Sequence, residues 1–367
     1  MGAQPMLRQW SAAVNDLFCS LHGHTAKALA CFSFAMCLAG HCHSGRLAAA
    51  APAAGAKVAS ARRRWERLVA NGRLDPSRAI GELAAAVARG WRGRPLLLVL
   101  DETPAGRGLR CLRLGVAYRR RLLSLGAECY PADAPPLPMP ELVCRLLRRT
   151  AAALPADARV TLLADRGLSW PAVLDCCRRL GWGHVLRLQR STRVRPEGGG
   201  GRVLAAGDLV TRGGRAWHGR AAIFKKAGWR DARVTAVWDR RCDEPWLLAA
   251  RADGGPAGLR AAEAYAKRNW CEQTFRDEKG GGFRWDRSRV ADPARALRVV
   301  LVMALATLLA ISLGTWVVKA GRRRDLDPHR SRRLSVFQLG LRHLLHAVAA
   351  GGDRPAAPPY LPYLHPS

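Results

Sequence analysis

The amino-acid sequence predicts an α/β fold preceded by a helical segment. Two short, continuous apolar runs at 95–100 and 160–164 have the composition of strands buried on both faces of a sheet. Helical patterns follow at about 140–153 and 169–180, so strands and helices alternate along this part of the chain, as they do in α/β proteins. Over residues 1–90, apolar residues instead recur at helical spacing, which predicts a small all-helical domain.

The order of these patterns divides the 367 residues into five regions. They are a helical, DNA-binding region (1–90), the first part of the α/β core (91–189), a β-strand-rich insertion (190–258), the second part of the core (259–350) and a Gly- and Pro-rich disordered tail (351–367). Further strands are expected near 111–118, 121–127 and 184–188, and in the insertion near 202–204, 217–224, 232–239 and 246–250. Further helices are expected over about 259–279, 299–318 and 334–349.

The charge balance indicates a polyanionic partner. Lys and Arg number 60 and Asp and Glu number 28, which gives a formal net charge of +32. Nucleic acid is the first expectation and an anionic membrane surface the second, whereas an enzyme acting on small metabolites is not the expected class. The run Arg62, Arg63 and Arg64 fits a DNA-binding helix, and it equally fits a solvated helix face.

The 11 cysteines are scattered, and none forms a C-x-x-C pair. Together with an N-terminus that has no secretory pattern, this usage predicts reduced thiols in a cytoplasmic protein. Cys31, Cys37 and the stretch 41–43 (His-Cys-His) lack the paired spacing of structural zinc sites, so no zinc is expected.

Two aspartates follow the two buried runs directly. Asp101 comes after the run 95–100, and Asp165 comes after the run 160–164. In α/β sheets, ligands bind at the carboxyl ends of the strands, and paired carboxylates there suit Mg²⁺ or Mn²⁺. The alternative is that each aspartate caps the turn that follows its strand.

The predicted helix over 259–279 carries four polar residues on one face. At about 100° per residue they fall within a sector of roughly 60°. These residues are Tyr265, Arg268, Glu272 and Lys279, whereas the other acids of this helix, Glu263, Asp277 and Glu278, point to other faces. One carboxylate among cations suits a site for metal and phosphate, and the alternative is a solvated polar face with incidental pairing.

These residues carry a resemblance to a known family. The pattern Tyr265-x2-Arg268-x3-Glu272-x6-Lys279 matches the Y-R-E-K signature of the fourth family of bacterial insertion-sequence transposases, which are DDE enzymes with a β-strand insertion. The segments around Asp101 (Asp-Glu-Thr) and Asp165 (Ala-Asp-Arg-Gly) resemble the first and second acidic blocks of that family. The resemblance covers roughly residues 10–345 and implies a ribonuclease H-like catalytic core.

The resemblance also implies the activity. Asp101, Asp165 and Glu272 would hold two Mg²⁺ (or Mn²⁺) ions for in-line phosphoryl transfer, and an insertion sequence would be excised through a DNA hairpin and inserted elsewhere. The partners would be double-stranded DNA at the terminal inverted repeats and the target, and the protein would act as a homodimer on paired ends, in the nucleoid-associated cytoplasm.

The DNA-contacting residues expected on this basis are Tyr265 and the phosphate-binding Arg268 and Lys279. A tryptophan of the insertion is expected to stack on a base extruded during hairpin formation. Trp217 is the first choice because it lies between Arg215 and Arg220.

Two other functions remain open. A structure-selective nuclease on the same fold would need the same acids without strand transfer. A membrane-anchored basic protein is suggested by residues 299–318, which are uncharged and long enough to cross a bilayer. The resemblance favours a helix buried behind the catalytic site, and therefore no membrane partner.

Overall fold

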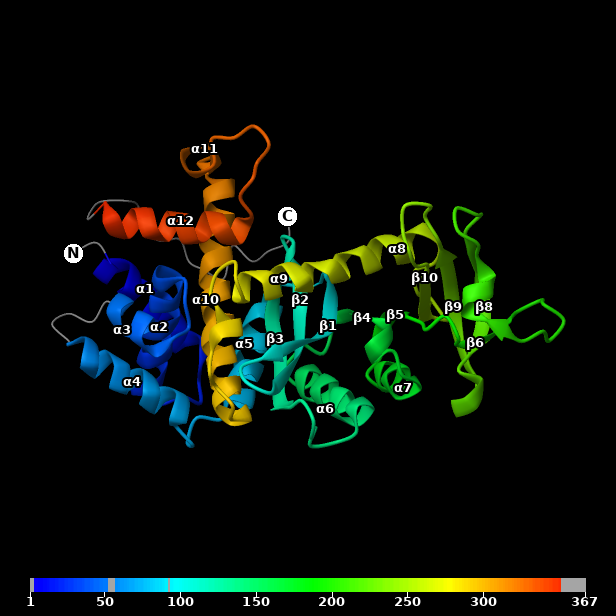
Figure 1. Cartoon of the computed structure of the whole chain (residues 1–367), viewed down its shortest axis with the longest axis horizontal. Coiled ribbons are helices and arrows are strands. Elements are labelled where there is room, and N and C mark those ends of the chain that lie inside the picture. Colours follow the sequence, from blue (N-terminus) through cyan, green and yellow to red (C-terminus); the bar gives the residue numbers. More distant parts are fainter. Residues whose placement is uncertain (1–2, 52–56, 92, 351–367) are drawn as a thin grey trace.

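The computed structural model describes residues 3–51, 57–91 and 93–350 (Figure 1). The predicted disordered tail at 351–367 lies outside these residues. The α/β prediction is confirmed, because one large mixed sheet is combined with helices. In the described part of the chain this sheet has ten strands in the order β3-β2-β1-β4-β5-β10-β9-β8-β6-β7.

The strands are close to the predicted runs. Their bounds are β1 Pro95–Ala105, β2 Leu109–Tyr118, β3 Arg121–Pro131, β4 Arg159–Ala164, β5 Gly183–Arg187, β6 Arg193–Pro196, β7 Leu204–Ala205, β8 Trp217–Ile223, β9 Arg230–Val237 and β10 Trp246–Arg251. β1, β4 and β5 run parallel to one another, and the other pairings are antiparallel. Of the parallel strands, β1 and β4 carry the continuous apolar runs, because both of their faces are covered.

The strands of the predicted insertion continue the main sheet. β10 lies antiparallel beside β5, with Leu248 opposite Arg187, and β9, β8, β6 and β7 follow outward. β6 was not predicted, and the strand expected at 202–204 is the two-residue β7. Local periodicity does not say which strands pair, so the sequence did not predict that the insertion extends the sheet.

The helices flank the central strands and extend beyond the β3 end of the sheet (Figure 1). Their bounds are α1 Ala3–Leu17, α2 Gly23–Ala39, α3 Ser44–Ala50, α4 Val58–Ala70, α5 Pro76–Arg89, α6 Met139–Ala151, α7 Pro171–Arg179, α8 Leu259–Ala266, α9 Trp270–Glu278, α10 Pro293–Lys319, α11 Arg323–Leu326 and α12 Val336–Ala349. In Figure 1, α8 and α9 lie on one side of the central strands, and α6 and α7 on the other.

Alternating residues of the parallel strands pack against these two helical layers. Val99, Leu163 and Val185 belong to one buried cluster with Tyr265 and Phe275 of α8 and α9. Leu98, Leu162 and Leu186, each one residue away along its strand, belong to the main core with α6 and α7. This period of two means that a residue's parity along β1, β4 or β5 decides which helical layer it faces.

The apolar segment 299–318 lies within α10, which is buried as predicted. Asp292 caps its N-terminus by accepting a hydrogen bond from the Arg295 N–H. By length and composition it is the one described helix that could cross a membrane by itself, yet its most apolar stretch is wholly buried. α10 packs against α12, α2, α5 and β3 (Figure 1), so one continuous core joins the N-terminal helices, the sheet and the C-terminal helices.

Two glycines allow α10 and α12 to approach closely. A Cβ atom added at Gly314 of α10 would lie 1.8 Å from the carbonyl oxygen of Val336. A Cβ atom added at Gly340 of α12 would lie 1.7 Å from the carbonyl oxygen of Ala310. Both contacts are with backbone atoms, which cannot rotate away, so any side chain here must push the helices apart.

We expect Gly314→Ala to lower the free energy of unfolding by about 1–3 kcal/mol or more, because overpacking a helix contact displaces backbone. Chemical denaturation measures this change. Gly81→Ala in α5 is the matched control, since its Cβ would meet only Ala153 at 4.0 Å and alanine is the better helix former. Equal stability of the two variants would contradict the close packing of α10 and α12.

Candidate active site

Asp101 and Asp165 lie side by side at one edge of the parallel strands. The last pair in the ladder between β1 and β4 is Leu100 opposite Ala164. Asp101 is the next residue of β1, and Asp165 directly follows the end of β4. The prediction that the first strand ends at residue 100 is wrong, because β1 continues to Ala105 through its pairing with β2. Asp101 therefore lies within β1. At this point β1 is still paired with β2, but its neighbour on the other side, β4, has already ended.

The helix that brings the third acid is interrupted. α8 and α9 are joined by a turn of 3-10 helix at Lys267–Asn269, which differs from the single helix expected over 259–279. The hydroxyl of Tyr265, from α8, donates a hydrogen bond of 2.9 Å to Oδ1 of Asp165. The Tyr265 ring packs edge-on against Trp246 of β10. Tyr265 thus fixes the helix over the edge where the aspartates lie.

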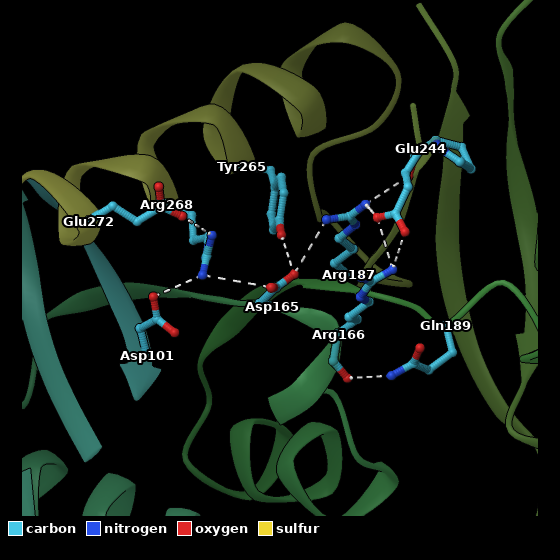
Figure 2. Close-up of polar contacts among 10 residues, drawn as sticks. Asp101, Asp165, Arg166, Arg187, Gln189, Glu244, Tyr265, Arg268 and Glu272 are labelled. Carbon is cyan, nitrogen blue, oxygen red and sulfur yellow. Dashed lines mark hydrogen bonds and ion pairs between the residues drawn. The ribbon is translucent and has the colours of Figure 1, made fainter. Parts of the chain in front are cut away.

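Arg268 lies between the three acids (Figure 2). Its Nη2 atom is 2.8 Å from Oδ2 of Asp101 and 3.7 Å from Oδ2 of Asp165, and its Nη1 atom is 2.8 Å from Oε1 of Glu272. The structure therefore brings Asp101, Asp165 and Glu272 together around one guanidinium group. Arg268 itself is largely buried, with 13% of its side chain exposed, whereas Glu272 is half exposed.

The described residues contain no group of three or more His, Cys, Asp or Glu side chains already placed to hold a metal ion. At the three acids, the cation in the centre is Arg268. Asp101 and Asp165 both direct an oxygen toward the same Nη2 atom, so their carboxylates already face one shared position. An oxygen donor set of this kind fits a hard divalent cation, provided that the guanidinium moves aside.

The two aspartates have opposite pKa shifts. Burial raises the pKa of Asp101, although the charge of Arg268 and a hydrogen bond from Cys271 act against it. Burial also acts to raise the pKa of Asp165, but the Arg166 N–H, the Arg268 charge and the Tyr265 hydroxyl outweigh it, so this pKa is lowered. Such shifts in neighbouring carboxylates are typical of functional sites.

Cys271 belongs to the site and was not predicted. Its Sγ atom lies 2.8 Å from Oδ2 of Asp101, and burial raises the thiol's pKa, so that the thiol donates a hydrogen bond. The spacing in the sequence could have indicated this contact. Cys271 directly precedes Glu272, and it lies three residues after Arg268, about one helical turn along the same predicted helix.

Three further charged residues surround Asp165 and were also not predicted. Arg187, at the end of β5, has Nη1 3.7 Å from Oδ1 of Asp165 and Nη2 3.0 Å from Oε2 of Glu244. Arg166 directs its Nη1 atom at both carboxylate oxygens of Glu244, at 2.9 Å each (Figure 2). Glu244 precedes β10, and only the pairing of β10 with β5 brings it here.

Two predicted site residues lie apart from this cluster. Lys279 follows the end of α9 with non-helical backbone angles, so the face calculated for a continuous helix does not extend to it. Its ammonium group makes no hydrogen bond or ion pair with the three acids within the described part of the chain. Trp217 is half-buried in β8, which β9 and β10 separate from β5, and the tryptophan that contacts Tyr265 is Trp246.

The rival acids of the helix point away, as predicted. The Glu278 carboxylate accepts two hydrogen bonds from Arg113 of β2, at 2.8 and 3.0 Å, and Asp277 pairs with Arg121 of β3. All four side chains are about nine-tenths buried or more. Glu263 is exposed on α8. The two buried pairs hold the end of α9 against the sheet. Glu272 is therefore the acid of this helix that lies beside Asp101 and Asp165.

No family model and no curated protein matches this chain.

We expect Glu278→Gln to lower the free energy of unfolding by about 3–5 kcal/mol, because it leaves the buried Arg113 guanidinium without a counter-charge. Denaturant unfolding measures the change, with the exposed Glu263→Gln of α8 as a control expected to stay within about 0.5 kcal/mol of the parent. Replacing the whole pair, as Arg113→Met with Glu278→Leu, should recover most of the loss. A small effect of Glu278→Gln would show that the pair does not hold α9.

Proposed function

We propose that this protein is a DNA transposase of the DDE type with the Y-R-E-K signature, built on a ribonuclease H-like core. The observation that carries the proposal is the meeting of Asp101, Asp165 and Glu272 around Arg268. These acids come from two strands and a helix far apart in sequence. Three of the four signature residues, Tyr265, Arg268 and Glu272, contact the site or form it.

The three carboxylates would hold divalent ions, Mg²⁺ or Mn²⁺, two of them in the proposed reaction. Bound there, such ions supply an activated water or 3′-hydroxyl and offset negative charge on the phosphate and the leaving oxygen. Asp101 and Asp165 suit the shared position because both already face one point. Glu272, which is half exposed and contacts the Nη1 atom of Arg268, would complete the set of ligands from the helix.

The neighbouring residues have separate tasks in this proposal. Tyr265 holds the carboxylate of Asp165 in place through its hydrogen bond. Arg268 neutralises the acids in the free protein, and once displaced it would face the phosphate backbone. Lys279, in the loop after α9, remains a proposed phosphate ligand, and Trp217 remains the proposed stacking residue.

The partner in this proposal is double-stranded DNA, at the element's terminal inverted repeats and at a target. The formal net charge of +32 supports this partner. Two DNA ends would be paired by two copies of the chain in the cytoplasm, where the nucleoid lies.

The proposed activity is tested with a labelled DNA fragment that carries the inverted repeats bracketing the coding region. We expect cleavage at the repeat ends in Mg²⁺ and joining of the labelled end to a second DNA. Cleavage without joining would instead favour a structure-selective nuclease. No cleavage with Mg²⁺ or Mn²⁺ would contradict both.

We expect Asp101→Asn, Asp165→Asn and Glu272→Gln each to reduce cleavage at least about a hundredfold, because each removes a charged oxygen ligand of the ions. Binding to the DNA ends should remain, since it depends on the basic surface. Cleavage and gel-shift assays measure the two properties separately. Glu263→Gln, on α8 and away from the acids, is the matched control and should cleave normally.

We expect Arg268→Gln to bind Mn²⁺ more tightly in the absence of DNA, by about tenfold or more. In the parent protein, the Arg268 guanidinium and the ion compete for the same oxygens. Two unit charges about 4 Å apart interact by about 4 kcal/mol at an effective dielectric constant of 20. Calorimetry or electron paramagnetic resonance measures the affinity. Arg276→Gln removes an equal charge from the exposed side of α9 and serves as the control. Equal Mn²⁺ affinities of these two variants would mean that the ion binds elsewhere.

We expect Glu244→Gln to bind short duplex DNA more tightly than Asp243→Asn without divalent metal. Both variants raise the net charge by one, but only the first removes the acid that Arg166 and Arg187 share. Asp243 is fully exposed and lies 3.8 Å from Arg212. The salt dependence of binding should steepen by about one or two counterions. Identical binding curves would show that DNA does not use these two arginines.

A further inference from the structure

A polar cavity lies away from the three acids. It has a volume of about 700 Å³ and is lined by residues of α7, β5, β6, β8, β9 and β10. His184, near the amino end of β5, is one of the residues that line this cavity. Asp165, in contrast, follows the carboxyl end of the neighbouring parallel strand, β4.

The sheet separates this cavity from the candidate active site. Val185 belongs to the cluster that packs with Tyr265 and α9, so its neighbour His184 faces the opposite side of the sheet. That side is covered by α7, which Figure 1 places across the strands from α8. A group bound beside His184 therefore cannot be the group that reacts at Asp101 and Asp165.

His184 is a buried side chain without partners. Its exposed fraction is 1%, and neither Nδ1 nor Nε2 has a hydrogen-bond partner among the described residues. Burial, together with the charges of Arg251 and Arg178, lowers its pKa to about 4, so the imidazole is neutral and carries one N–H donor. A buried donor left unpaired is unfavourable, so this imidazole requires a hydrogen-bond partner inside the cavity.

Two arginines beside His184, Arg178 and Arg251, are not held in a close ion pair. The charge of Arg178 acts on Asp175, which is itself held by Arg230, but neither Arg178 nor Arg251 forms an ion pair or hydrogen bond with a carboxylate among the described residues. A third arginine of the lining, Arg220, is 3.4 Å from Asp253. The fourth, Arg195, lies over the ring of Trp229.

The remaining acids of the lining, Glu197 and Asp231, are exposed and form no ion pair within the described residues. The lining therefore holds four arginines and three acids, and the charges that act on the imidazole are those of Arg178 and Arg251.

We propose that this cavity binds a phosphate group, held by the guanidinium groups of Arg178 and Arg251 and by the N–H of His184. A phosphate offers several acceptor oxygens in a tetrahedral arrangement, and two forked guanidinium groups with one ring N–H are donors only toward it. The volume leaves room for a nucleotide unit attached to that phosphate. The phosphate comes either from the DNA backbone or from a soluble nucleotide.

The test compares two double variants that each remove two exposed charges. Arg178→Gln/Arg251→Gln removes the proposed ligands, and Arg89→Gln/Arg179→Gln removes two arginines that do not line the cavity. The probes are inorganic phosphate, a deoxynucleoside monophosphate and a short duplex DNA, titrated by calorimetry without divalent metal. Nuclear magnetic resonance follows the His184 ring signals, assigned by their loss in His184→Gln.

We expect the cavity variant to bind at least one probe about tenfold more weakly than the control variant, and the His184 signals of the parent protein to shift on titration with that probe. A loss confined to duplex DNA assigns the site to the DNA backbone, and a loss for phosphate or the monophosphate assigns it to a soluble compound. Equal binding by both variants with every probe, or unshifted His184 signals at saturation, overturns the proposal. No cleavage is measured, so this result does not depend on the proposed transposase activity.

Discussion

The contact of the Arg268 guanidinium with three carboxylates is the interaction on which the candidate active site depends. Asp101, Asp165 and Glu272 come from separate elements, and clustered carboxylates without a cation repel one another and resist ionisation. Arg268 allows these acids to lie together in the free protein. The same geometry requires that a divalent ion compete with this side chain for its oxygens, so binding of the ion and movement of Arg268 would be coupled.

The remainder of the site keeps Arg268 within reach of the aspartates. Tyr265, Cys271 and Phe275 pack the two short helices onto one face of the sheet. The buried pairs Arg113–Glu278 and Arg121–Asp277 fasten the far end of α9 to β2 and β3. Buried pairs of this kind add little net stability compared with apolar residues, but breaking one is costly, which makes them effective at fixing position.

Arginine therefore has three physical roles in this strongly basic chain. Arg113 and Arg121 are buried partners of single acids, and Arg268 is shared by three acids. Arg178 and Arg251 form no close ion pair among the described residues, and they line a cavity on the other face of the sheet.

Several parts of the site were predictable because they depend on local periodicity. A buried parallel strand needs a continuous apolar run, and the residue after that run reaches the edge of the sheet, which located Asp101 and Asp165. Helical periodicity also separated Glu272 from Asp277 and Glu278. It failed at Lys279, because the helix ends at Glu278 and its register cannot be carried past that end.

The sequence by itself determined the α/β order, the two aspartates and the helical face that carries Tyr265, Arg268 and Glu272. Only the tertiary structure decided that protein, not lipid, covers α10 here, because an apolar circumference is equally suited to either surrounding. It alone placed β10 beside β5, and with it Glu244 near Asp165 and Arg251 near His184. Strand pairing joins residues distant along the chain through backbone hydrogen bonds, and local side-chain patterns do not specify which edges meet.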